Sequence, residues 1–224
     1  MLRRILSAAL AAGLLAGVLV SVLQAVTTTP LILQAEVFET SGGHEPAPGH
    51  DHAHAAPGAP DLDDIVQRTA LTVVANLVTG VGFALLVVGA FALSGRPVEA
   101  REGLLWGLGG FAAFTLSPAL GLPPELPGTI AADLAERQAW WAFAAAGAAG
   151  GLAMLAFGRG AWKLPVGLAL LIAPHAIGAP HPTAFGGVVP AELAGQFVAK
   201  SIVVSAIFWA VLGWLAGGFF RRFG

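Results

Sequence analysis

The basic residues of this chain gather at one set of ends of its apolar stretches. Eight of the eleven Lys and Arg residues form four close pairs, which are Arg3/Arg4, Arg96/Arg101, Arg159/Lys163 and Arg221/Arg222. Two apolar runs separate each pair from the next. Because Lys and Arg in short loops stay on the cytoplasmic side of a membrane, this pattern predicts six membrane-spanning helices with both termini in the cytoplasm.

The apolar runs have the length that a membrane crossing needs. About 20 apolar residues cover the hydrocarbon core as a helix, and we expect spans at 5–26, 70–93, 103–121, 139–158, 164–179 and 201–220. The chain is 56% hydrophobic and 11% charged, whereas soluble domains carry about 25% charged residues. These features predict an all-α polytopic protein, a single membrane domain over residues 1–224. A secretory signal peptide is the alternative for the first run, and its cleavage would leave five spans.

Composition excludes several classes of function. A net charge of −2 gives no basic surface for nucleic acid. The absence of Cys excludes disulfides, thiolate metal sites and iron–sulfur clusters. There is no Gly-rich loop ending in Gly-Lys-Ser/Thr, so the chain does not hydrolyse ATP in the P-loop manner. We therefore expect no enzymatic activity and no permanently bound cofactor.

Four predicted spans carry two glycines one helical turn apart, at Gly13/Gly17, Gly103/Gly107, Gly147/Gly151 and Gly213/Gly217. Small residues at this spacing let two helix backbones approach closely in lipid. A generally Gly-rich composition, with 30 Gly in the chain, is the alternative explanation.

Two hairpins of predicted spans echo each other in sequence. Pro118–Pro123 resembles Pro174–Pro180 with one inserted residue, His175, and each segment is followed by Pro-x-Glu-Leu, containing Glu125 or Glu192. Repeats in one orientation would be related by an axis along the membrane normal, which would place the two glutamates at equal depth. A plain helix start, with Pro fixing φ and Glu favouring the helix dipole, is the alternative.

Four of the six histidines lie in the first extracytoplasmic loop, at His44, His50, His52 and His54. Residues 41–63 are rich in His, Pro and Gly, so we expect a flexible loop that lacks apolar bulk. Neutral imidazoles suit late divalent transition metals. The loop is predicted to capture metal with modest affinity, the alternative being a low-complexity spacer.

His175 and His181 flank the outer end of the fifth predicted span, among three prolines and a glycine. We expect a rigid, non-helical path there, because irregular backbone near a membrane normally lines a cavity or is buried in protein. Together with Glu125 and Glu192 these histidines are predicted to form a metal site at the outer mouth. Interfacial histidines bonded to backbone carbonyls are the alternative.

The predicted spans hold no acidic residue or His at mid-depth. The polar candidates inside them are Thr72, Asn76, Thr79, Thr115, Ser117 and Ser205. One ionised side chain at the bilayer centre costs about 2.5–3.5 kcal/mol on insertion scales, so a bare dication needs help. Water, a partner subunit or a homo-oligomer would have to supply it.

Several short motifs resemble the CbtA family, the predicted cobalt transporter subunits of bacteria. They are Leu122–Gly128, Arg137–Trp141, the His segment Pro174–Pro182, and Phe208-Trp209 with Leu212-Gly213. The resemblance spans most of the chain except about 41–62. It implies cobalt uptake through the bacterial inner membrane for cobalamin synthesis, with a small single-span CbtB-type partner that has a His-rich end. The family is usually described with five spans, whereas six are predicted here, and this chain has a His tract of its own.

The sequence thus predicts a multi-pass permease subunit that moves Co(II) inward. Nickel is the alternative cargo, because Co(II) and Ni(II) accept similar ligands. A non-transporting membrane scaffold or assembly factor with a metal-sensing His loop is the alternative of a different class, and the scarcity of polar groups within the spans favours it.

Overall fold

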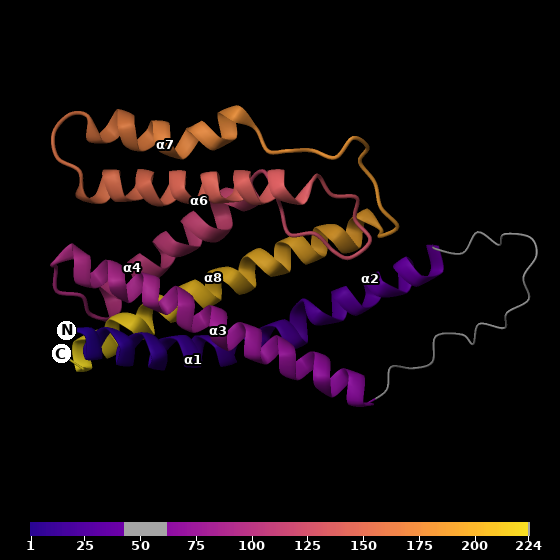
Figure 1. The fold of residues 1–224 in the computed structure, drawn as a ribbon, viewed down its shortest axis with the longest axis horizontal. Coiled ribbons are helices and arrows are strands. Elements are labelled where there is room, and N and C mark those ends of the chain that lie inside the picture. The colour runs from indigo at the N-terminus through magenta and orange to yellow at the C-terminus, as the bar shows by residue number, and fades with distance from the viewer. Residues whose placement is uncertain (43–61, 224) are drawn as a thin grey trace, which may run out of the picture.

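The computed structural model describes residues 1–42 and 62–223, and every named element in these ranges is helical (Figure 1). The elements are α1 (Leu2–Thr27), α2 (Thr29–Gly42), α3 (Leu62–Ser94), α4 (Ala100–Phe111), the π-helical turn η1 (Ala112–Leu116), α5 (Ser117–Ala119), α6 (Leu134–Phe157), α7 (Lys163–Ile177) and α8 (Ala191–Arg222). The all-α prediction is confirmed for this part of the chain. The four loop histidines, His44, His50, His52 and His54, lie outside the described residues.

Four of the six predicted spans correspond to helices long and apolar enough to cross a membrane, which are α1, α3, α6 and α8. The other two correspond to α7, with 15 residues, and to the consecutive elements α4, η1 and α5 over residues 100–119. The chain is a helical membrane protein. Crossing by all six segments stays a prediction.

Three helices extend the fold beyond the predicted spans at the end opposite the termini, which the charge pattern predicts to be the outer end. α3 begins at Leu62 rather than 70, α8 begins at Ala191 rather than 201, and α2 was not expected. The 33 residues of α3 cover about 50 Å, more than the hydrocarbon thickness of about 30 Å. Hydropathy marks where an apolar stretch ends, but a helix continues into water when neighbours support it.

An ion pair joins two of these extensions. Arg68 of α3 donates two hydrogen bonds to the carboxylate of Glu36 in α2, one of them 2.9 Å long. The bonds from Arg68 hold the pKa of Glu36 below its usual value. The outer end of α3 is thereby tied to the segment that follows α1.

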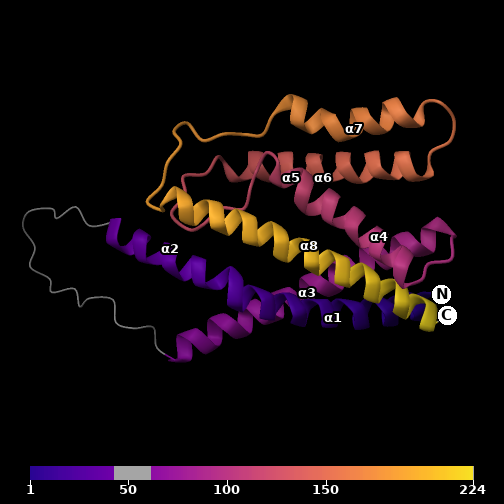
Figure 2. The same ribbon diagram turned by 180° about the vertical axis from the view of Figure 1, so that it is seen from behind.

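The helices form two layers. α1, α3, α4 and α8 pack into one bundle, and α6 and α7 lie side by side as a second layer (Figures 1 and 2). The core of the bundle includes Phe91, Val88 and Leu212, all fully buried. The second layer meets the bundle mainly where α6 packs on η1 and α5. Because α1 buries four alanines in this core, it packs as an integral element of the bundle.

Glycine pairs mark the close helix contacts, as the sequence predicted. Gly13 of α1 packs on Gly80 of α3, where an added Cβ at Gly80 would lie 2.5 Å from the Gly13 carbonyl oxygen. Gly103 and Gly107 of α4 meet Gly213 of α8, and the pair on α6 meets the backbone of α7. No side chain fits at these contacts, so the glycines are needed for backbone approach rather than being a consequence of composition.

The predicted repeat of two helical hairpins is wrong. α4 packs along α8 and α6 packs along α7, whereas α7 and α8 make no close backbone contact. The second predicted hairpin, α7 with α8, therefore does not exist as a packed unit. α4 thus packs on a glycine-bearing helix far along the chain, whereas α6 packs on its neighbour in the chain.

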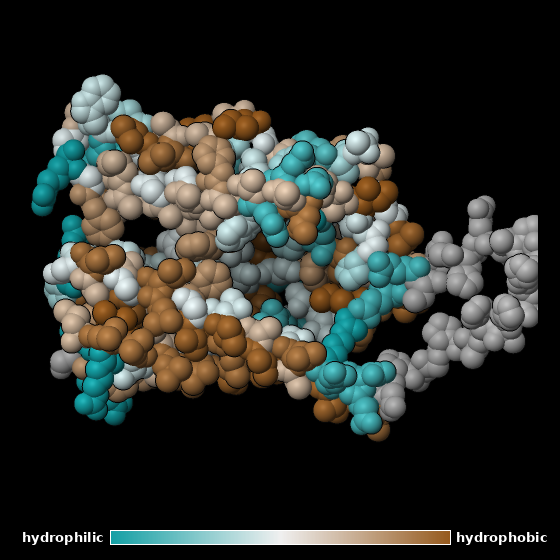
Figure 3. Space-filling model, in the orientation of Figure 1, coloured by the Kyte–Doolittle hydropathy of each residue, from teal (hydrophilic) through white to brown (hydrophobic). Residues whose placement is uncertain are grey.

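All four basic pairs lie at the end of the molecule that holds both termini (Figure 1). At this end Arg221 lies 2.9 Å from Glu99, and Arg4 Nε donates to the Phe220 carbonyl at 2.6 Å. Figure 3 shows a hydrophobic surface between two hydrophilic ends. The shared end agrees with the topology predicted from charge, while its cytoplasmic location stays a prediction.

Candidate functional site

Glu125 lies in an ion pair at the end of the molecule opposite the termini. Its carboxylate accepts a hydrogen bond of 2.6 Å from Arg137 in the first turns of α6. Asp133 starts that helix by accepting bonds from the backbone N–H groups of Ala135 and Glu136, as an N-cap residue does. The chain therefore fixes Arg137, and through it the position of Glu125.

His175 lies in the last turn of α7, and the expectation of a non-helical path through residues 174–177 is wrong. Gly178, with φ of +89°, ends the helix in the way that a glycine just beyond a helix commonly does. His175 Nε2 lies 3.2 Å from Ser117 Oγ, and its ring meets Trp140 edge-on at 5.9 Å. His175 thus links α7 to α5 and α6.

The other two residues of the predicted outer-mouth site lie elsewhere. His181 is exposed beside Phe185, with ring centres 5.8 Å apart, and Glu192 is exposed in the first turn of α8. Within residues 1–42 and 62–223 no group of three or more His, Asp or Glu side chains comes together as a metal site. The structure places the four residues at one end without gathering them, and metal binding by them stays a prediction.

A polar cavity of about 200 Å³, open to the surface on one side, lies between α1, α3, η1 and α8. Four of the six intramembrane polar candidates line it, namely Asn76, Thr79, Thr115 and Ser205, joined by Gln24 of α1. Each of these residues was predicted individually from the sequence, but their convergence on one cavity was not. The nearby Gly13–Gly80 contact, which brings α1 against α3, was the signal that could have shown it.

Hydrogen bonds fix the polar groups of this cavity. The Asn76 amide nitrogen donates to Ser21 Oγ at 3.0 Å and to Gln24 Oε1 at 2.7 Å. The indole N–H of Trp209 donates to Thr115 Oγ1 at 3.2 Å. The Asn76 carbonyl oxygen and the hydroxyls of Thr79 and Ser205 supply neutral acceptors at the cavity. Such groups suit water and weakly held cations, because none of them carries a compensating charge.

Aromatic rings form one wall of the polar cavity. Phe114 and Trp209 stack with ring centres 5.7 Å apart, and Phe83 lies 4.7 Å from Trp209 and 5.4 Å from Phe114. Trp209 is buried at 2% exposure. This aromatic wall, defined by Phe83, Phe114 and Trp209, separates the polar cavity from the space between the two layers.

The π-helical turn η1 places both Phe114 and Thr115. Its wider ring shows in the bond from the Ser117 N–H to the Ala112 carbonyl. Pro118 follows directly, and a proline inside a helix removes one N–H and crowds the carbonyl four residues earlier, here that of Phe114. The wider turn accommodates this proline, so Pro118 was a signal for the irregularity. Such turns are frequent at functional sites.

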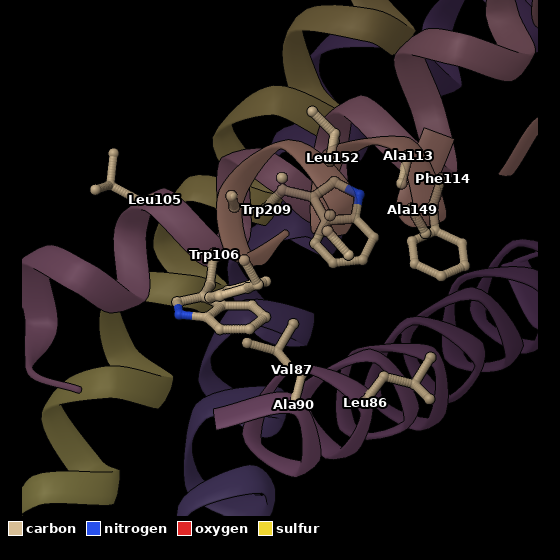
Figure 4. Close-up of a pocket in the computed structure, with 15 residues that line it drawn as sticks. Leu86, Val87, Ala90, Leu105, Trp106, Ala113, Phe114, Ala149, Leu152 and Trp209 are labelled. Atoms are coloured by element: carbon tan, nitrogen blue, oxygen red, sulfur yellow. The ribbon is translucent and has the colours of Figure 1, made fainter. Parts of the chain in front are cut away.

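Three cavities meet at Phe114. A cavity of about 430 Å³, called the outer cavity after the predicted orientation, is lined by Glu125, Arg137 and Thr115 among others. Thr115 also lines the polar cavity. An apolar cavity of about 400 Å³ lies beyond the aromatic wall. Phe114 lines all three. Figure 4 shows Phe114 and Trp209 at the apolar cavity together with Trp106 and Val87.

Of the comparisons with known proteins, only the one with protein families gives a match. No curated protein and no solved structure matches this chain. The profile of the family described as "Probable cobalt transporter subunit (CbtA)" matches residues 2–221, nearly the whole chain. The match includes the bundle, the second layer and all three cavities, and the chain therefore belongs to the CbtA family.

Proposed function

We propose that this chain is the membrane permease subunit of a bacterial inner-membrane system that takes up Co(II) for cobalamin synthesis. The observation that carries the proposal is the polar cavity within the bundle, which adjoins the outer cavity at Thr115. A scaffold has no need of amide and hydroxyl groups gathered in one cavity between apolar helices. The CbtA profile match supports transport by this chain as a subunit.

The ion crosses the bundle as a hydrated species. Neutral oxygens cannot replace the charge compensation that a dehydrated dication needs in hydrocarbon, but they hydrogen-bond well to its water shell. Weak binding also suits transit, since a conducting site must release the ion as readily as it accepts it. Asn76, Thr79 and Ser205 act in this step as water ligands rather than as metal ligands.

Metal is gathered at the outer end before it reaches the polar cavity. In this proposal the loop histidines His44, His50, His52 and His54 capture Co(II) with modest affinity, and His175, His181, Glu125 and Glu192 receive it at the outer mouth. Arg137 holds Glu125, so an arriving dication competes with a guanidinium for that carboxylate.

The aromatic wall closes the polar cavity on the side of the space between the two layers. Passage therefore needs a further opening step, and a small single-span CbtB-type subunit or a second copy of this chain supplies it in our proposal. Selectivity between Co(II) and Ni(II) does not arise from neutral oxygens, because nitrogen and oxygen sites generally bind Ni(II) more tightly than Co(II). Nickel remains the alternative cargo.

Two threonines on α3 provide a matched test of the proposal. Thr79 lines the polar cavity, whereas Thr72 donates to the Arg68 carbonyl and does not line that cavity. Thr79→Val should lower radiolabelled Co(II) uptake by cells at least tenfold, and Thr72→Val should leave it unchanged at equal protein level in the membrane. Equal uptake by the two variants would remove the cavity from the path.

The same assay distinguishes the alternatives. Parallel uptake of labelled Ni(II) that exceeds that of Co(II) would assign nickel as the cargo. If the wild-type chain, expressed with its genetic neighbour, moves neither metal, the scaffold function is correct and transport is not.

A further inference from the structure

The apolar cavity opens sideways between the two layers. It is bounded by α3, α4 and α6, and its rim residues Leu86 and Leu105 are 56% and 64% exposed. Figure 3 shows the surface hollowed between the α6–α7 layer and the bundle. In a bilayer this opening faces acyl chains rather than water, because it lies along the apolar flank of the helices.

The depth of the apolar cavity matches one leaflet. On α6 its lining runs from Ala149 to Phe157, a rise of about 12 Å along the helix. Half of the hydrocarbon core measures about 15 Å. Phe114 and Trp209 close the cavity towards the middle of the bundle, and Phe157 lies at the end that carries the basic pairs. The cavity therefore has the length and direction of an acyl chain in the leaflet at that end.

A cation is placed at the mouth of this cavity. The guanidinium of Arg96 lies 4.8 Å from the centre of the Phe157 ring, and Phe157 stacks on Trp106 with ring centres 5.4 Å apart. Among the described residues no carboxylate pairs with Arg96. Arg221 at the same end is paired with Glu99. Arg96 thus presents a positive charge at the level where lipid phosphates lie.

We propose that the apolar cavity is a binding site for one anionic phospholipid, with an acyl chain inside it and the phosphate on Arg96. Its lining is almost entirely apolar, since Leu, Val, Ala, Phe and Trp residues predominate, so water gains few hydrogen bonds there. The acyl chain of a zwitterionic lipid would fill the cavity equally well, but its head group would bind the guanidinium less tightly. Each basic residue near a membrane surface contributes about 1 kcal/mol to the binding of anionic lipid.

The bound acyl chain has a structural consequence. It fills the space between the layers and supports the far side of the aromatic wall, at Phe114 and Trp209. The polar cavity keeps its shape only while this wall stays in place. Lipid occupancy would therefore stabilise both layers together, whichever ion the protein moves.

Lipid retention measured by native mass spectrometry tests the charge. Protein released from nanodiscs with equal phosphatidylglycerol and phosphatidylcholine should retain one phosphatidylglycerol. Arg96→Gln should lower that preference about fivefold, the factor that about 1 kcal/mol represents. Arg3→Gln, which removes an equal charge at the same end but away from the cavity, should leave it unchanged. Equal loss in both variants, or no retained lipid in the wild type, would overturn the proposal.

A second pair of variants tests the cavity without changing charge. Ala153 lines the apolar cavity, and Ala146 is exposed on the same helix outside it. Ala153→Phe should displace the acyl chain and reduce the retained lipid, while Ala146→Phe should not. If the filled variant retains phosphatidylglycerol as well as the control does, the acyl chain lies elsewhere and the site is refuted.

Discussion

The polar cavity and the apolar cavity share one wall and differ in the polarity of their other lining residues. Phe114 and Trp209 line both. On one side α1 and α3 add Gln24, Asn76 and Thr79, whereas on the other side α6 adds only Ala, Leu and Phe. The difference comes from the helix that completes each space, not from the wall. A single aromatic layer can therefore separate a route for hydrated ions from a space suited to lipid.

The largest effect should come from breaking the helix contact behind that wall. Gly107 packs against the Trp209 backbone, where no Cβ fits. Gly107→Leu should separate α4 from α8 and destabilise the protein by about 3 kcal/mol or more, abolishing both cavities. Gly89→Leu, on α3 with open space around it, is the control. Thermal unfolding in detergent should show a lower midpoint temperature for Gly107→Leu only. Equal midpoints for the two variants would show that Gly107 is not needed for the contact between α4 and α8.

The glycine contacts also show how far the sequence could predict this fold. Spacing identified Gly13/Gly17 and Gly103/Gly107 as packing faces, and basic pairs identified the shared end. Neither feature predicts which helices pack together, because any glycine-bearing face could in principle pack against any other. The hairpin repeat failed for this reason.

The candidate site was predicted in its parts but not in its arrangement. Asn76, Thr79, Thr115 and Ser205 were each identified as polar within apolar spans, yet they come from three segments far apart in sequence. Their convergence depends on the α1–α3 contact and on the π-helical turn at Thr115. His175 and His181 show the opposite case. They are close in sequence, but their side chains have different neighbours, Ser117 for His175 and Phe185 for His181.

Removing the wall itself should join the two cavities. Trp209→Ala would open a passage between them and remove the indole hydrogen bond to Thr115. We expect passive Co(II) leakage through proteoliposomes, measured by quenching of an enclosed metal-sensitive dye. Trp214→Ala, at an exposed position on the same helix, should not leak. A tight Trp209 variant that retains its fold would show that the rings are not the barrier.

A smaller effect should follow from changing only the polar side of the wall. Thr115→Val keeps the shape of the side chain and removes the acceptor for Trp209 Nε1, which should cost about 1 kcal/mol. Co(II) uptake should fall several-fold, and the tryptophan emission should shift because one buried indole loses its partner. Thr129→Val, in the loop before α6, is the control. If uptake falls but emission does not change, the hydroxyl serves the ion and does not orient Trp209.

The smallest effect is expected where the outer cavity meets water, at the Glu125–Arg137 pair. Both side chains are partly exposed, at 27% and 29%, and pairs of this kind contribute about 0–1 kcal/mol to stability. Glu125→Gln should therefore leave thermal unfolding nearly unchanged. It also leaves the Arg137 charge uncompensated at the cavity mouth, which should repel a dication and raise the half-saturating Co(II) concentration without lowering maximal uptake. The rise should shrink at high salt, because screening weakens the interaction between exposed charges.

The double variant Glu125→Gln/Arg137→Gln removes both charges and should restore part of the lost affinity for Co(II). If the double variant binds as poorly as Glu125→Gln, the carboxylate acts as a direct metal ligand rather than by balancing Arg137, and the outer-mouth site then includes Glu125 itself.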